Sequence, residues 1–120
     1  METTKKNKQE LEFVEALQLA RHAAIMAGTN NQENGGSCNF DQPILGKLPD
    51  GITWRTLKGL KDSYGRPMVV KIDYGFWKGC YRIPFIPLWG QGKQRTRMAE
   101  AAANSLKESG LNATVYYQID

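Results

Sequence analysis

The stretch from Leu111 to Ile119 limits the possible folds more than any other part of this sequence. Apolar and polar residues alternate along it without interruption, which is the period of a β-strand with one face on a core and the other in solvent. The apolar face carries Leu111, Ala113, Val115, Tyr117 and Ile119. Such a strand needs a sheet with one covered face, so the rest of the chain must supply the covering layer.

Two segments with helical periodicity can form that layer. Between Gln9 and Ala27 apolar residues recur at intervals of three and four, and Gly28 follows as a stop signal. A second helix is expected from Arg97 to Ser109, with Thr96 as its N-cap and Gly110 as its C-terminal stop. Each helix has one apolar side, and both are therefore expected to pack on the sheet.

Three further strands complete the prediction. Residues 52–57 form a short alternating run, and residues 68–74 and 79–86 form a hairpin. Pro84 cannot donate a ladder hydrogen bond, so the second hairpin strand is either an edge or broken there. The order of these elements predicts an α+β fold: a mainly antiparallel sheet of about four strands, with an N-terminal helix and a C-terminal helix packed on one face.

The chain has 120 residues, which suits one domain. Residues 1–8 are polar and include three lysines, and we expect them to be disordered. The single domain then spans residues 9–120. Within it, residues 29–51 are rich in glycine, asparagine and proline. Because Phe40, Ile44 and Leu45 can anchor this segment to the core, we expect a long ordered loop.

Positive charge is concentrated in the middle of the chain. The formal charge of +4 divides into −2 for residues 1–46, +8 for residues 47–97 and −2 for residues 98–120. Such a section favours a phosphate-bearing or otherwise anionic partner if folding gathers the cations on one surface, and the alternative is a basic face that serves only solubility. For Lys71, Asp73 and Arg82, an ordinary cross-strand charge network is expected.

The segment from Trp89 to Arg97 is the strongest candidate for an anion site. Its two glycines allow a ligand to approach the backbone closely, and the helix that follows offers free N–H groups and the positive end of its dipole. The spacing excludes a P-loop and a dinucleotide-binding fingerprint. The alternative is a flexible turn whose cations face water. The expected ligand-binding residues are Trp89, Gly90, Gln91, Gly92, Lys93, Gln94, Arg95 and Arg97.

A second candidate is the run from Asn34 to Asp41. Its short polar side chains lie on a glycine-rich backbone and can bind sugar hydroxyls or base edges, and its aromatic ring can stack on a base. The alternative is a tight turn whose polar side chains bond to their own backbone. The residues expected to close over a ligand are Asn34, Ser37, Asn39, Phe40 and Asp41.

Three more side chains bear on a binding site. Arg21 falls within the apolar stripe of the first helix, where it either snorkels to solvent or meets a buried anion, and it is counted among the ligand-binding candidates. Trp77 lies at the hairpin tip and Trp89 beside the glycine turn. An exposed tryptophan at either place favours a ligand or a partner.

Catalytic, metal and membrane functions have less support. Cys38, Cys80 and His22 are too few for a structural zinc site, and no cofactor is expected. An enzyme that uses Cys38 as its nucleophile is the weaker alternative. No stretch approaches the ~20 apolar residues of a membrane span, and no signal peptide is recognisable, so a cytoplasmic protein with no membrane partner is expected.

Residues 34–41, 81–92 and 115–118 together resemble small uncharacterised proteins carried by phages and mobile elements of Gram-positive bacteria. The resemblance implies a stoichiometric action against host defence in the host cytosol, either by sequestering a nucleotide signal or by blocking a protein effector. It assigns a role to no residue.

These observations lead to two hypotheses about function. The first is non-enzymatic binding of a phosphate-bearing small molecule, such as a nucleotide signal, by a homo-oligomer whose subunits share a pocket. The second is a basic surface that binds or occludes a nucleic acid or a host protein.

Overall fold

The computed structural model describes residues 5–30, 41–89 and 92–117. Helices and a four-strand antiparallel sheet make up this part of the chain, which confirms the predicted α+β class. In chain order the elements are α1 (Lys5–Asn30), β1 (Gln42–Leu45), α2 (Trp54–Leu57), β2 (Val70–Lys71), β3 (Tyr81–Arg82), α3 (Lys93–Glu108) and β4 (Ala113–Tyr116).

β1 lies inside the sheet, whose strand order is β2-β3-β1-β4. Gln42 of β1 pairs with Tyr116 of β4, and Ile44 of β1 pairs with Arg82 of β3. Arg82 pairs in turn with Val70 of β2. Paired residues share a face and successive residues alternate between faces, so all five side chains lie on one face. We call it the open face, because the long helices pack on the other one.

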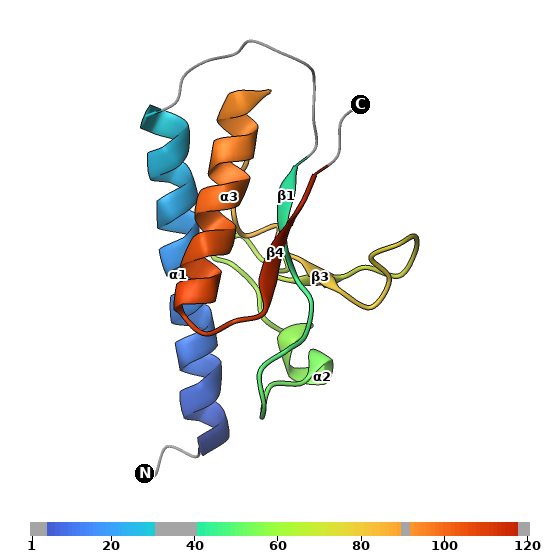
Figure 1. Ribbon diagram of the computed structural model, residues 1–120. Coiled ribbons are helices and arrows are strands. Elements are labelled where there is room, and N and C mark those ends of the chain that lie inside the picture. Colours follow the sequence, from blue (N-terminus) through green and yellow to red (C-terminus); the bar gives the residue numbers. More distant parts are fainter. Residues whose placement is uncertain (1–4, 31–40, 90–91, 118–120) are drawn as a thin grey trace.

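That other face of the sheet is covered by α3. Leu45 and Ala113 lie on this side and belong to the same buried cluster as Met98 and Leu106 of α3. α3 also packs along α1, so the two long helices lie side by side on one side of the sheet (Figure 1). The predicted packing of the N-terminal and C-terminal helices on one face of the sheet is confirmed.

α1 is longer than predicted at both ends. It begins at Lys5, so the expectation of disorder over residues 1–8 is wrong for residues 5–8, and residues 1–4 lie outside the described part. The helix also continues past Gly28 to Asn30. A Cβ atom at Gly28 would lie 2.6 Å from Sδ of Met98 and 2.7 Å from the ring of Trp89. Glycine therefore serves close packing at this position, and it does not end the helix.

The predicted loop over residues 29–51 contains regular structure. Thr29 and Asn30 belong to α1, and residues 42–45 form β1. The prediction of a continuous loop is wrong because turn-forming residues on both sides, together with Pro43 inside the strand, mask its short apolar run. Of the three expected anchors, Ile44 and Leu45 are fully buried, and Phe40 lies outside the described residues.

A helical turn replaces the strand predicted over residues 52–57. Thr53 has an extended backbone, and its Oγ1 accepts a hydrogen bond from the N–H of Thr56 at 3.3 Å, which is the geometry of an N-cap. Ile52 and Leu57 are buried while Thr53 and Arg55 are exposed. The alternation in the sequence therefore comes from one helical turn and its cap.

The hairpin prediction is confirmed, although its strands are shorter than expected. β2 and β3 are antiparallel neighbours, and residues 72–80 connect them. β3 ends at Arg82, before Pro84, and it lies between β2 and β1. Of the two predicted alternatives for Pro84, a break in the strand is therefore correct and an edge strand is wrong.

α3 begins four residues earlier than predicted, at Lys93, with Gly92 as its N-cap. Thr96 lies in the first turn, so its assignment as the N-cap is wrong. The predicted end is confirmed: Gly110 has φ of 86°, its N–H donates to the carbonyl of Lys107, and Leu111 donates to the carbonyl of Leu106. Together these bonds make a Schellman cap. No helix in residues 5–30, 41–89 or 92–117 is long and apolar enough to cross a membrane.

Candidate functional site

The open face of the sheet carries a hollow with a volume of about 390 Å³. All four strands contribute to it: Gln42, Val70, Arg82 and Tyr116 line its floor, one from each strand. Residues 71–77, which lead out of β2, complete the lining. We call this cavity the open-face hollow.

One wall of the hollow is the arm formed by residues 72–80. The N–H of Ile72 donates to the carbonyl of Cys80 at 2.8 Å, and the N–H of Gly79 donates to the carbonyl of Ile72 at 2.9 Å, so the hairpin ladder continues into the arm. Gly75 and Gly79 have φ of 76° and 92°, values that glycine adopts without strain. The chain therefore reverses within a few residues, and the arm projects beyond the sheet (Figure 1).

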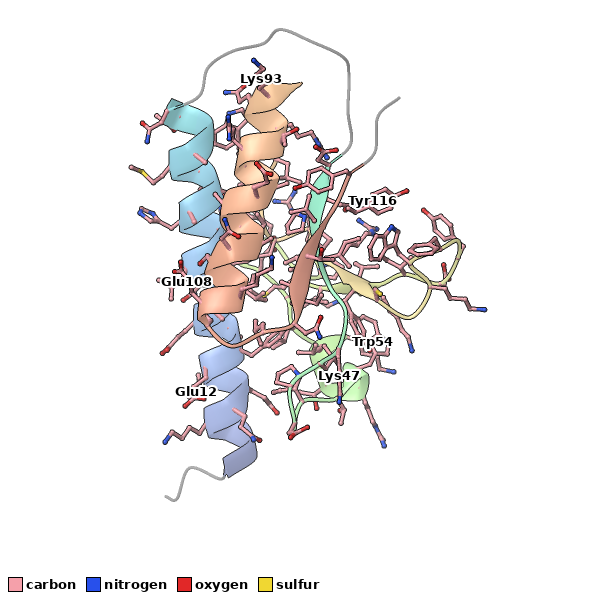
Figure 2. The ribbon with its side chains drawn as sticks, viewed as in Figure 1. Glu12, Lys47, Trp54, Lys93, Glu108 and Tyr116 are labelled. Atoms are coloured by element: carbon pink, nitrogen blue, oxygen red, sulfur yellow. The ribbon has the colours of Figure 1, made fainter. Side chains whose placement is uncertain are left out.

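Aromatic contacts hold the arm to the open face. The ring centroids of Trp77 and Tyr116 lie 5.5 Å apart with an interplanar angle of 33°, and Phe76 meets Trp77 edge-on at 5.2 Å. Side chains of the arm gather beside Tyr116 (Figure 2). Trp77 is half-buried by these contacts, whereas Phe76 is 91% exposed and Tyr74 is 79% exposed. The arm therefore presents large apolar rings to solvent around the hollow.

The charged side chains of the hollow are Lys71, Asp73 and Arg82. All three are exposed. Within the described residues none of them forms an ion pair, since the pair found there joins Arg66 and Asp62. Lys71 pairs with Tyr81 and Arg82 pairs with Val70, so Lys71 and Arg82 start from opposite faces of the sheet, and the expected cross-strand charge network is not formed. Counted over the residues that line the hollow, two cations against one carboxylate give a net positive charge.

The sequence candidates at the start of α3 do lie beside the end of the asparagine-rich run. Asp41 is 3% exposed, and its carboxylate oxygen Oδ2 accepts a hydrogen bond from Thr96 Oγ1 at 2.7 Å. Nε of Arg95 donates to the backbone carbonyl of Asp41 at 3.1 Å, and Nε2 of Gln94 donates to the carbonyl of Gly28 at 2.8 Å. Asp41, Gln94 and Arg95 thus bind parts of the chain itself, as buried polar groups must.

The other sequence candidates are placed as follows. Gly92 is buried at the N-cap of α3, and Lys93 and Arg97 are exposed on its first two turns. Trp89 is 39% exposed and lies close to Gly28. Arg21 is exposed, with its guanidinium 4.9 Å from the ring centroid of Phe85. The candidates outside the described residues are Asn34, Ser37, Asn39, Phe40, Gly90 and Gln91.

The residues considered for catalysis or metal binding do not form a site in the described part of the chain. Cys80 is a half-buried free thiol and His22 is exposed. Cys38 lies outside the described residues. Among those that are described, no three His, Cys, Asp or Glu side chains lie close enough to hold a metal ion.

Some residues of the open-face hollow could be named from the sequence, but their assembly into one cavity could not be predicted. The sequence predicts the place of Trp77 at the hairpin tip. The expectation that Lys71 and Arg82 share a polar face is wrong, because Lys71 pairs with Tyr81 and Arg82 pairs with Val70. Tyr116 and Gln42 could not be named, because their position depends on the pairing of β1 with β4, and β1 lay inside a predicted loop. The missed signal is the short run Pro43 to Leu45, which is apolar and β-branched at its centre.

No family model, curated protein or solved structure matches this chain.

Proposed function

We propose that this protein binds, without chemical conversion, a phosphate-bearing ligand that also carries a flat ring, such as a nucleotide. The supporting observation is the open-face hollow, in which an aromatic arm and two cations outside any described ion pair surround one cavity. Its volume of about 390 Å³ falls within the range of roughly 300–1,000 Å³ that small-molecule sites occupy.

The two parts of such a ligand match two parts of the lining. Trp77 and Tyr116 offer ring faces on which a base can stack, an interaction worth about 1–3 kcal/mol per base. Arg82 presents a planar guanidinium that fits phosphate oxygens in a bidentate manner, and Lys71 adds a second positive charge.

The lining supports binding more than catalysis. Its only described carboxylate is Asp73, which has no second carboxylate, histidine or cysteine beside it in the described lining. Histidine is the commonest general acid or base, and an adjacent base is a common way to activate a nucleophile. A protein that holds a nucleotide without converting it acts stoichiometrically, so sequestration of a nucleotide signal against a host defence is the role that we propose for it.

Calorimetry with a panel of linear and cyclic nucleotides tests this function. Replacing the half-buried ring (Trp77→Ala) is expected to weaken binding by roughly 5- to 150-fold, from the loss of ~1–3 kcal/mol of stacking. Replacing the cation (Arg82→Gln) is expected to weaken binding of nucleotides but not of free nucleosides. The matched control Arg55→Gln removes an exposed charge that does not line the open-face hollow. The function is wrong if no nucleotide binds, or if R55Q weakens binding as strongly as R82Q.

A second candidate function is binding of single-stranded nucleic acid across the open face. The exposed rings of Tyr74 and Phe76 favour it, because they extend the stacking surface beyond what one nucleotide can cover. Affinity should then rise with oligonucleotide length and fall steeply with salt. If mononucleotides bind as tightly as oligonucleotides, this second candidate is excluded and the first is retained.

A further inference from the structure

A second hollow, with a volume of about 270 Å³, lies between α1, the segment 62–67 and the segment 84–87. Its charged residues are Arg21, Arg66 and Asp62, and its apolar walls come from Tyr64, Phe85 and three prolines. It shares no lining residue with the open-face hollow. We call it the arginine hollow.

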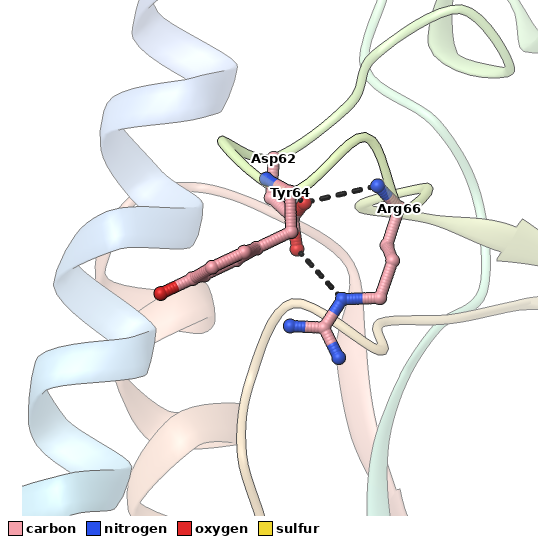
Figure 3. A network of polar contacts seen from close by, with 3 residues as sticks. All are labelled: Asp62, Tyr64 and Arg66. Atoms are coloured by element: carbon pink, nitrogen blue, oxygen red, sulfur yellow. Dashed lines mark hydrogen bonds and ion pairs between the residues drawn. The ribbon is translucent and has the colours of Figure 1, made fainter.

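The single carboxylate of this hollow, that of Asp62, already accepts hydrogen bonds from the backbone of its own turn. Oδ1 of Asp62 accepts hydrogen bonds from the N–H groups of Tyr64 at 2.8 Å and Arg66 at 2.9 Å, and Oδ2 lies 3.5 Å from Nε of Arg66 (Figure 3). The hydrogen bond from the Arg66 N–H is the main cause that holds the pKa of Asp62 below its ordinary value. Asp62 therefore stays ionised and fixes the turn.

Arg66 is held so that its outer nitrogens stay available. Its Nε faces Asp62, while its two terminal nitrogens point away from that carboxylate (Figure 3). The guanidinium carbon lies 5.2 Å from the ring centroid of Tyr64. Contact with an aromatic face limits the orientations of a guanidinium without using its N–H donors. The two terminal nitrogens of Arg66 are therefore available to a further acceptor.

Arg21 reaches the same hollow from α1. Its guanidinium carbon lies 4.9 Å above the ring centroid of Phe85, and no ion pair involves Arg21 within the described residues. Two guanidinium groups, each placed by an aromatic ring, thus line one cavity that contains a single, already bonded carboxylate. Of the two alternatives predicted for Arg21, snorkelling is correct: the side chain reaches the surface and does not meet an anion inside the core.

We propose that the arginine hollow is a second ligand site, which takes an oxyanion, carboxylate or phosphate, attached to a small flat apolar group. Arginine donates paired, parallel hydrogen bonds to both kinds of oxyanion. The ring of Tyr64, which is 80% exposed, and the prolines at 67, 84 and 87 form an apolar wall for the rest of the ligand. The volume of 270 Å³ lies just under the usual range for ligand sites, so the ligand is smaller than a nucleotide.

Binding of benzoate, phenyl phosphate and inorganic phosphate, followed by NMR chemical shifts of the backbone amides, tests the site. We expect at least one of the two ring-bearing probes to bind and to shift amides of segments 62–67 and 84–87. The stronger of the two identifies the oxyanion as a carboxylate or a phosphate. Inorganic phosphate should bind more weakly than phenyl phosphate, because it lacks the flat group.

Variants decide whether the two arginines form the site. Arg21→Gln and Arg66→Gln should each weaken binding about tenfold or more, while Arg21→Lys and Arg66→Lys, which keep the charge but lose the paired donors, should weaken it less. Arg55→Gln and the double variant K71Q/R82Q should leave it unchanged, and the double variant also separates this site from the proposed nucleotide site. Thermal melting confirms that each variant is folded.

Three results would overturn the proposal. The first is that neither ring-bearing probe binds. In the second, R55Q weakens binding as much as R21Q, which indicates general attraction of anions to a basic protein. In the third, only K71Q/R82Q weakens it, which places the probe in the open-face hollow.

Discussion

At the scale of single residues, Gly28 shows how closely α1 approaches its neighbours. Its carbonyl accepts the side-chain hydrogen bond of Gln94, and its missing side chain leaves room for Met98 and Trp89. Sequence patterns predict glycine as a helix stop, since glycine is a poor helix former. The pattern cannot show that a second helix passes so near that only glycine fits, because that contact joins residues far apart in the chain.

The substitution Gly28→Ala is expected to destabilise the protein. Alanine improves helix propensity by about 1 kcal/mol, but overpacking costs about 1–3 kcal/mol, and a Cβ atom would lie 2.7 Å from the Trp89 ring. We expect the free energy of unfolding to fall by about 1 kcal/mol, measured by chemical denaturation. Gly59→Ala is the control, because its Cβ would meet its nearest neighbour at 3.6 Å. Equal effects of the two substitutions would contradict the packing argument.

The buried carboxylate of Asp41 leads to a second residue-scale prediction. Its hydrogen bond from Thr96 joins the start of β1 to the first turn of α3. Thr96→Val keeps the side-chain shape and removes the donor, so we expect the free energy of unfolding to fall by about 2 kcal/mol. Thr114→Val on the exposed part of β4 should change it far less. Similar values for T96V and T114V would show that the Asp41 contact is not needed for stability.

At the scale of elements, the secondary structure could be predicted from the sequence where residues close together in the chain determine it. The hairpin of β2 and β3 and the end of α3 at Gly110 follow from residues close together in sequence. The strand expected over residues 111–119 is present as β4, but it spans only residues 113–116, and Tyr117, expected on the covered face, is 59% exposed. The signal for the helical turn that begins after Thr53 is also local, but the spacing of the apolar residues over 52–57 fits a strand equally well. β1 and the open-face hollow required strand pairing between distant segments, and pairing of that kind leaves no short-range signal.

The turn that begins at Asp62 makes the stability of the protein depend on pH. Since the pKa of Asp62 is lowered in the folded state, chiefly by the N–H of Arg66, its carboxylate stabilises the fold above the unfolded pKa of about 4. That contribution is lost as the pH falls through the lower, folded pKa. We therefore expect Asp62→Asn to be less stable than the wild type at neutral pH, with the difference closing in strong acid.

Chemical denaturation of both proteins across this pH range measures the difference. Asp73→Asn removes an exposed carboxylate of the arm and is measured alongside as the control. A difference between wild type and D62N that stays constant down to strong acid would show that the Asp62 charge does not stabilise the turn.

The arm formed by residues 72–80 should behave as a separately opening element. Because Trp77 joins it to Tyr116, Trp77→Ala is expected to speed hydrogen exchange at the amides of Ile72 and Gly79. Global stability should fall by about 0.5–1.5 kcal/mol for each of the two aromatic pairs that Trp77 makes, with Tyr116 and with Phe76. Tyr74→Ala, at a ring 79% exposed, should leave exchange unchanged. Unchanged exchange in W77A would mean that backbone bonds alone hold the arm.

At the scale of the whole molecule, the basic middle of the chain is divided between different surfaces. Lys71 and Arg82 line the open-face hollow, Arg66 lines the arginine hollow, and Arg95 is bonded to Asp41. A charge count along the sequence could not separate these environments, since it does not show which cations already have partners. The cations that we propose to bind ligands are those that line the two hollows.

The homo-oligomer stays a prediction, and native mass spectrometry of protein purified from cells tests it. We expect a mass of two or more chains, with additional mass from a retained small anion, because a small domain can deepen a shallow hollow by sharing it between subunits. A strictly monomeric protein that becomes saturated on addition of nucleotide would refute the shared pocket and keep the binding function.

The position of β1 has a consequence for how the molecule is assembled during synthesis. Among the described strands β1 is made first, yet one of its two neighbours is β4, which follows the other described elements along the chain. A ribosome that has completed α3 has not yet produced the strand that closes the sheet. Until then one backbone edge of β1 stays unpaired, so a nascent chain stalled shortly before β4 would be open to chaperones and proteases.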